Sequence, residues 1–399
     1  MQLNELETPA LVLDSTIMDR NIERLRDRLS RFNVVLRPHL KTNKSADVSR
    51  RIAAPGSPVT VSTLKEAEYF LGHGWTDILY AVGIAANKFT HVARLIEQGA
   101  RMTVVLDNVE SARALAQFCR DRGLTLPVLV EIDTDGHRSG VQPDDPLLLD
   151  IAALLNRSAE AGGAWLAGVM THAGASYACT STAQIEALAE QERAGAVHAA
   201  QRLRSADFPA PVVSVGSTPT AHFARSLDGV TEVRAGVFVF FDLVMSGLGV
   251  CSESDIALSV LCTVIGHQKE KGWIVTDAGW MAMSRDRGTS RQRVDQGYGV
   301  VCDVDGQLLP DLIMVDANQE HGIIAHRRDH NLTPMLPVGT MLRILPNHAC
   351  ATAAQHGGYV VVDGHARCQG KLGPIQRLVV IADVLRSLRM ARIGGHGLG

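Results

Sequence analysis

The chain of 399 residues is longer than one average domain, which favours two domains with sizeable cores. A formal net charge of -3 without a basic run argues against nucleic-acid or anionic-membrane partners, and no segment has the roughly 20 apolar residues of a membrane span. Seven scattered cysteines without a CxxC pair, and an N-terminus that does not resemble a signal peptide, favour reduced thiols in the cytoplasm.

Short runs rich in Val, Ile and Leu alternate with helical patterns from residue 15 to about 240. The eight runs are 34–40, 59–63, 77–82, 102–106, 126–132, 165–172, 212–217 and 232–240. This is the strand count of a (β/α)8 barrel, which we predict over residues 15–250. A doubly wound open sheet is the alternative, although no GxGxxG follows the first run.

The first run ends in "RPHLK", where Arg37, His39 and Lys41 alternate with apolar residues. Alternation in a strand places these three basic side chains on the face that points into the barrel. Lys41 then lies at the carboxyl end of the strand, where barrel active sites are built. It either ends the strand in solvent or acts as a nucleophilic amine, and Arg37 and His39 would lower its pKa.

Polar turns follow the later runs. "VGSTPT" follows the seventh run, and its Gly216, Ser217 and Thr218 form either a helix cap or one half of a phosphate site, which Gly236 after the eighth run would complete. Arg138 follows the fifth run and either faces a ligand or pairs with Asp133 or Asp135.

After residue 250 the runs are β-like with few helical patterns, which predicts a second, mostly β domain. The strand-like segment 8–14 precedes the barrel and is expected to pair with that domain, so we assign residues 1–14 and 251–399 to it. The segment 383–399 resembles an amphipathic helix with a frayed, glycine-rich end.

His348 and Cys350 are two residues apart in "PNHACATAAQH" and would project to the same side of an extended segment. Imidazole and thiolate suit zinc or another late first-row cation. Two ligands are too few for a closed structural site, so the pair is either accidental or an open metal site.

Several of these motifs together resemble one family. "RPHLKTNKS", "EIDTDGHRSGV", "VVSVGSTPTA", "NQEHG" and "PNHACATAAQH" are similar to the D-serine dehydratase and D-threonine aldolase branch of the pyridoxal-phosphate enzymes with the alanine-racemase fold. The resemblance covers about 350 residues, and it implies the same barrel and β domain. It also implies that Lys41 is the Schiff-base lysine and that Lys44 is a bystander.

The resemblance implies roles for the other candidates as well. His172 would stack on the cofactor ring, Tyr177 would line the site, and His321 would contact substrate. His348 and Cys350 would bind a divalent metal (Zn, or Mn, Co, Ni or Mg) beside the cofactor. A homodimer is implied too.

The activity implied is a metal-assisted dehydratase of 3-hydroxy D-amino acids, such as threo-3-hydroxyaspartate or D-serine. A D-3-hydroxy amino acid aldolase is the alternative, although "HACATAAQH" favours a dehydratase because the aldolases tend to have Asp at the position of Cys350. A cofactor carrier without catalysis would need neither the β domain nor the metal pair. In "SRDRG", Arg285 and Arg287 would bind a second substrate carboxylate if the segment is extended, with Asp286 pointing elsewhere, or would lie in a solvated loop.

Overall fold

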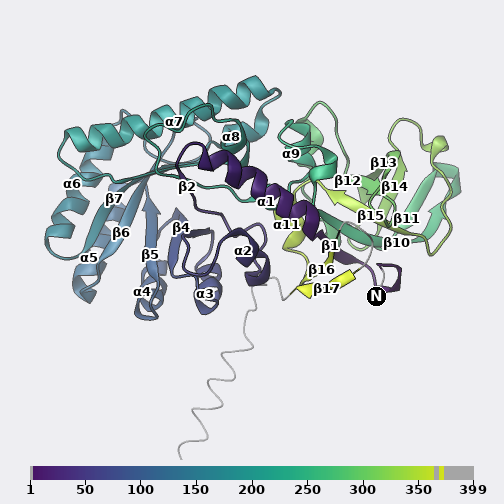
Figure 1. Ribbon diagram of the computed structural model, residues 1–399, viewed down its shortest axis with the longest axis horizontal. Helices are drawn as coiled ribbons and strands as arrows, with labels where there is room; N and C mark the ends of the chain where they lie inside the picture. The colour runs from purple at the N-terminus through teal and green to yellow at the C-terminus, as the bar shows by residue number, and fades with distance from the viewer. Residues whose placement is uncertain (1–2, 364–367, 373–399) are drawn as a thin grey trace, which may run out of the picture.

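The computed structural model describes residues 3–363 and 368–372, and its two sheets lie end to end along the long axis of the molecule (Figure 1). The helix expected over 383–399 lies outside the described residues. No helix in the described part is both long and apolar enough to cross a membrane.

The first sheet has eight parallel strands in the order β2-β9-β8-β7-β6-β5-β4-β3. They are β2 (Val35–Leu36), β3 (Val59–Val61), β4 (Asp77–Gly83), β5 (Arg101–Leu106), β6 (Leu126–Ile132), β7 (Ala164–Thr171), β8 (Val212–Val215) and β9 (Glu232–Val233). The chain beyond β2 meets β3, because the Thr60 amide donates to the Pro38 carbonyl and the Leu40 amide donates to the Thr60 carbonyl, both at 2.9 Å. These bonds close the sheet, so the barrel prediction is confirmed and the open sheet is wrong.

Helices cover the outside of the barrel, and the longer ones bury one largely apolar face. They are α1 (Ser15–Ser30), α2 (Ala46–Ile52), α3 (Leu64–Gly72), α4 (Phe89–Glu97), α5 (Val109–Arg122), α6 (Leu147–Glu160), α7 (Thr182–Ser205) and α8 (Thr218–Phe223). In α1, Met18, Ile22, Leu25 and Leu29 are buried at the spacing of one helical face. Several helices begin at a side-chain cap, as α7 does at Ser181.

The second sheet has nine strands in the order β11-β14-β13-β12-β15-β10-β1-β16-β17, and a further β10–β11 pairing closes part of it. They are β1 (Ala10–Asp14), β10 (Leu258–Gln268), β11 (Trp273–Thr276), β12 (Gly299–Cys302), β13 (Leu308–Ala317), β14 (Gly322–His326), β15 (Met341–Pro346), β16 (Tyr359–Val362) and β17 (Cys368–Leu372). As expected for segment 8–14, β1 pairs with strands from the far end of the chain, antiparallel to β10 and parallel to β16.

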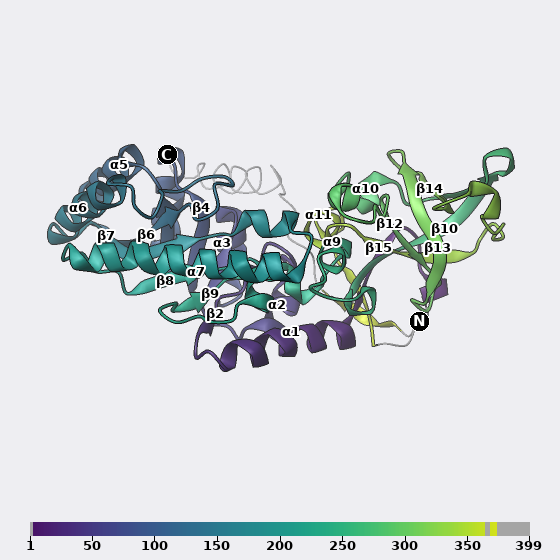
Figure 2. The same ribbon diagram turned by 90° about the horizontal axis from the view of Figure 1, so that it is seen from above.

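The last barrel run is shorter than the sequence predicts. Only Glu232–Val233 is a strand, and Val237–Val239 forms a 3-10 turn. Phe238 and Phe240 are fully buried there because the segment passes from the barrel into the second domain. The short helices α9 (Leu243–Gly247), α10 (Trp280–Met283) and α11 (Ala349–Ala353) follow, and α9 and α11 lie where the two domains meet (Figure 2).

Candidate active site

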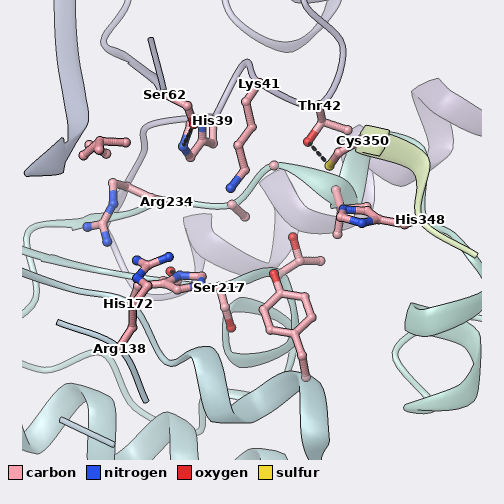
Figure 3. A pocket seen from close by; sticks show the side chains of 18 of the residues that line it. His39, Lys41, Thr42, Ser62, Arg138, His172, Ser217, Arg234, His348 and Cys350 are labelled. Atoms are coloured by element: carbon pink, nitrogen blue, oxygen red, sulfur yellow. Dashed lines mark hydrogen bonds between the residues drawn. The ribbon is translucent and has the colours of Figure 1, made fainter. Parts of the chain in front are cut away.

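A cavity of about 650 Å³ lies at the carboxyl ends of the barrel strands, where the second domain meets the barrel. Ten of the residues expected in the site line it. They are Lys41, Arg138, His172, Tyr177, Gly216, Ser217, Thr218, Gly236, His348 and Cys350. In Figure 3 the Lys41 side chain extends into the cavity between His172 and His348. The structure therefore brings together side chains from both domains.

The turn after β2 fixes Lys41. Leu40 is fully buried and its amide donates to the Thr60 carbonyl, while the Lys44 amide closes the turn onto the Leu40 carbonyl at 2.9 Å, and in this turn Lys41 lines the cavity. His39 also lines the cavity, and its Nε2 lies 3.3 Å from the Ser62 hydroxyl. Burial, followed by the nearby charges of Lys41 and Arg234, holds the pKa of His39 well below its usual range, so this ring is neutral.

Arg37 and Lys44 do not line the cavity. The Arg37 guanidinium lies 2.7 Å from an Asp77 oxygen and 2.8 Å from a Glu232 oxygen. These two carboxylates thus neutralise the positive charge of Arg37, which was expected to act on Lys41. The Lys44 amine lies 3.8 Å from Glu66.

The segment after β8 both caps a helix and lines the cavity, so the two interpretations of "VGSTPT" are compatible. The Ser217 hydroxyl accepts from the Thr220 amide at the start of α8. The Thr218 hydroxyl is buried without a hydrogen-bond partner among the described residues. Gly216 has φ +138, and a Cβ there would lie 2.1 Å from the Arg234 carbonyl oxygen, so only glycine allows β8 and β9 to approach.

His172 lies beside this segment, at the end of β7. Its Nδ1 is 2.8 Å from the Gly216 carbonyl oxygen, which can only accept, so the ring carries its proton on Nδ1. Burial lowers the pKa of His172 to about 3, which keeps the imidazole neutral. The Tyr177 ring lies 6.1 Å from it, centroid to centroid, on the next turn of chain.

Arg138 pairs with neither of the expected aspartates. Asp133 and Asp135 accept backbone amides of their own loop, such as that of Gly136 at 2.7 Å. The guanidinium instead lies 3.6 Å from Glu131, a buried residue at the end of β6. Because 63% of the Arg138 side chain remains exposed, it is available to an anion in the cavity.

His348 and Cys350 flank the start of α11. The Nδ1 of His348 donates to an Asp286 oxygen at 2.6 Å, so Nε2 is the nitrogen that would bind a metal once its proton is released. Burial opposes the charge on His348, but hydrogen bonds to Asp286 and Cys350 raise its pKa to about 11. Burial likewise opposes a thiolate, yet His348 lowers the pKa of Cys350. An imidazolium beside a thiolate can release the imidazolium proton when a metal cation binds, and both side chains then serve as ligands.

Two further contacts place this pair. The Cys350 sulfur lies 3.2 Å from the Thr42 hydroxyl, next to Lys41 in sequence. Asp242 accepts the Met245 and Ala349 amides, each at 3.0 Å, and so joins α9 to α11. Within residues 3–363 and 368–372 no cluster of three or more His, Cys, Asp or Glu could hold a metal ion. The pair therefore fits an open site better than a closed structural one.

Three expected substrate residues lie away from the cavity. Arg285 stacks 4.9 Å from the Trp280 ring, Arg287 pairs with Asp295 at 2.9 Å, and His321 is exposed. Asp286, which was expected to point elsewhere, lines the cavity instead. The expectation assumed an extended segment, but the Gly288 amide closes a turn onto the Asp286 side chain.

Two further residues that line the cavity, Arg234 and Asp242, were not predicted from the sequence. The guanidinium of Arg234 lines the cavity wall and bonds to the Ser214 hydroxyl and the Thr171 carbonyl. Its position one residue after β9 was a usable signal, since barrel strands end at the active site. Asp242 directly follows an apolar stretch rich in phenylalanine, and a carboxylate next to such a stretch indicates a buried hydrogen bond.

Two family models match the chain: alanine racemase, N-terminal domain, over residues 13–244, and a serine dehydratase domain over 257–362. The D-threo-3-hydroxyaspartate dehydratase of Delftia sp. (strain HT23) is 54% identical, over 92% of this chain and 97% of that protein. Its solved structure has a TM-score of 0.90 at 52% identity, covering 94% of this chain and 99% of that one. A cysteine-to-alanine mutant of an enzyme with the same name, also at a TM-score of 0.90, was solved in a metal-free form.

More distant relatives have two different activities. The D-serine dehydratase of Dictyostelium discoideum is 28% identical, over 90% of this chain and 94% of that protein. The D-threonine aldolase from Filomicrobium marinum has a TM-score of 0.79 at 26% identity, covering 94% of this chain and 96% of that one. The dehydratase at 54% identity is thus much more similar to this chain than either of these.

Proposed function

The chain belongs to the alanine-racemase-fold family of pyridoxal-phosphate enzymes, in the branch of the D-serine dehydratases, and we propose that it dehydrates 3-hydroxy D-amino acids. The proposed substrates are D-threo-3-hydroxyaspartate, giving oxaloacetate and ammonia, and D-serine, giving pyruvate and ammonia. One observation carries the proposal. The lysine that would hold the cofactor and the His–Cys pair that would hold a metal open into the same cavity, linked by the contact of Thr42 with Cys350.

The cavity residues fit pyridoxal phosphate. Lys41 offers a primary amine to the cofactor aldehyde, and the unpartnered Thr218 hydroxyl with Ser217 and Gly236 would hold the phosphate. Arg138 would face the phenolic oxygen or the substrate carboxylate. When bound, the cofactor supplies an electron sink for the electrons left on the α-carbon after its proton departs.

The residues at the start of α11 fit a divalent cation. His348 would bind it through Nε2 and Cys350 through sulfur, a donor set that suits zinc, while Mn, Co, Ni and Mg are alternatives. When bound, the metal supplies a Lewis acid beside the departing hydroxyl. The metal-free cysteine mutant of the related enzyme supports this assignment.

Side chains of the protein would supply the remaining catalytic roles. Lys41 would take the α-proton, and Asp286 would hold the His348 ring in orientation. Neutral His172 would pack against the bound ring without adding a charge. Loss of the α-proton and the β-hydroxyl releases water and an enamine, and hydrolysis of the enamine yields the 2-oxo acid and ammonia.

An aldolase that cleaves the bond between the α- and β-carbons remains the second candidate. It would use the same lysine to hold the cofactor and the same metal to acidify the β-hydroxyl. The lower identity to the aldolase relative argues against it. A carrier without catalysis would use neither the metal pair nor the second domain.

We further propose a homodimer in the cytoplasm. Exposed apolar side chains on the second domain, Leu332, Met335 and Val338, are available for a contact between subunits. The six cysteines with described side chains are all unpaired, which supports a reducing compartment.

The test is ammonia release from each substrate by protein loaded with pyridoxal phosphate and zinc, before and after chelation and after zinc is restored. We expect turnover of D-threo-3-hydroxyaspartate that chelation removes and zinc restores. Full turnover by a preparation shown to be metal-free would overturn the metal assignment, and no turnover of either substrate would overturn the proposed activity.

A further inference from the structure

Glu192 lies in the middle of α7 with only 2% of its surface exposed, which is rare for a carboxylate unless it is paired. One of its oxygens, Oε1, accepts the Ala173 amide and the Gly216 amide, each at 2.9 Å. These amides follow the ends of neighbouring strands, β7 and β8. A single buried carboxylate therefore bridges two loops at the mouth of the barrel.

The bridge helps to fix the backbone of Gly216, the residue that precedes Ser217. The amide of Gly216 is held by Glu192, while its carbonyl oxygen accepts from Nδ1 of His172 at 2.8 Å. The hydroxyl of Ser217 lies 2.9 Å from that of Ser176, which belongs to the other loop. The peptide groups on both sides of Gly216 are thus each held by one hydrogen bond, and the cavity-lining residues Ser217 and Thr218 follow directly.

Glu192 itself does not line the cavity. Burial raises the pKa of its carboxyl, and hydrogen bonds from Thr220, Gly216 and Ala173 oppose that shift. Because the Gly216 amide is already bonded to Glu192, it is not available to an anion in the cavity. Any effect of Glu192 on a ligand must therefore act through the conformation of the loop.

We propose that Glu192 is the positioning residue of the phosphate loop, holding residues 216–218 in the geometry that binds the phosphate of the cofactor. This inference rests on the proposed function, since it requires that the loop binds the phosphate of pyridoxal phosphate. A purely structural role would stabilise the barrel without favouring ligands that carry a phosphate. The two roles differ in how strongly the protein discriminates pyridoxal phosphate from pyridoxal.

The experiment compares the affinities of apoprotein for pyridoxal phosphate and for pyridoxal, followed by absorbance titration. Glu192→Met keeps the side-chain length but removes both acceptor oxygens, and Glu192→Gln keeps one acceptor. Glu190→Gln is the matched control, because Glu190 is exposed on the same helix and pairs only with Arg193 in the described contacts.

We expect Glu192→Met to weaken pyridoxal-phosphate binding roughly thirtyfold, the loss of hydrogen bonds to a charged acceptor, and to change pyridoxal binding by less than about threefold. Glu192→Gln should restore most of the preference, and Glu190→Gln should match the wild type. If Glu192→Met weakens both ligands equally, or neither, the inference is overturned.

Two further results keep the test decisive. If Glu192→Met does not fold, Glu192→Asp retains the charge but is too short to reach both amides, and an unchanged preference in that variant would overturn the inference. A wild-type protein that binds pyridoxal phosphate no better than pyridoxal would overturn both this inference and the assigned phosphate site. A wild type with a clear preference that every variant shares would overturn the role of Glu192 alone.

Discussion

Replacing Asp286 with Ala tests how the metal pair is held. Asp286 is the hydrogen-bond acceptor for Nδ1 of His348, at 2.6 Å, and it fixes both the tautomer and the direction of the ring. Without Asp286 the imidazole can rotate, so its Nε2 is no longer held in the direction of the cation. Asp286 and His348 are 34% and 41% exposed, so water would replace part of the lost bond.

A charge-assisted hydrogen bond of this kind contributes about 2 kcal/mol, and partial exposure places the loss at roughly 10- to 30-fold in zinc affinity. The assay is zinc titration of chelated protein against a competing indicator. Asp286→Asn should stay within about threefold of wild type, because its amide oxygen still accepts from Nδ1.

Asp295→Ala is the matched control for this measurement. Asp295 pairs with Arg287 in the same region of the second domain but does not line the cavity. We expect its zinc affinity to equal that of the wild type. Unchanged affinity in Asp286→Ala, or an equal loss in Asp295→Ala, would refute the orienting role.

Three further predictions follow from the cavity and the barrel. Borohydride reduction should attach the cofactor covalently to the Lys44→Ala protein but not to the Lys41→Ala protein, as measured by mass spectrometry of the peptides. Cofactor attached in Lys41→Ala and absent from Lys44→Ala would show that Lys41 is misassigned. Arg285→Ala and Arg287→Ala should change the KM for D-threo-3-hydroxyaspartate by less than about threefold, because neither arginine lines the cavity; a tenfold rise in steady-state assays would return them to the site. Burial lowers the pKa of His222 from 6.5 to about 4 in the folded protein. As the pH falls below about 6.5, the unfolded protein therefore binds a proton at His222 that the folded protein does not bind. The free energy of unfolding should drop by about 2 kcal/mol between pH 7.5 and pH 5 for this reason. Denaturant unfolding should show that His222→Gln lacks this part of the loss, and an identical pH dependence in both proteins would contradict the assignment.

The barrel and much of the cavity could be predicted because each depends on local pattern. Apolar runs that alternate with helical segments mark the strands, and residues just after a strand must lie at the mouth of the barrel. Lys41, His172 and Ser217 were located in this way. The spacing of His348 and Cys350 left an accidental pair and an open metal site as alternatives, and the link of the pair to the barrel through Thr42 depends on a contact between residues 308 positions apart.

For residues 284–288 the sequence left two alternatives open, an extended segment that binds substrate and a solvated loop, and the extended alternative is wrong because strand alternation does not apply to a turn. Ser284 adopts φ +80, and the Asp286 side chain accepts the Gly288 amide, so that Asp286 lines the cavity while neither arginine does. Glu192 was missed for another reason. It lies three residues after Ala189 and four before Ala196, on the buried face of α7, but in the sequence a glutamate among alanines does not mark an apolar face.

The central claim is that the protein breaks the bond from the β-carbon to its hydroxyl and leaves the carbon chain intact. The most direct measurement is the product balance from D-threo-3-hydroxyaspartate with protein loaded with pyridoxal phosphate and zinc, in which oxaloacetate, ammonia, glycine and glyoxylate are quantified together. We predict one oxaloacetate and one ammonia for each substrate consumed, without glycine or glyoxylate. Glycine and glyoxylate in equal amounts would contradict the claim and identify an aldolase.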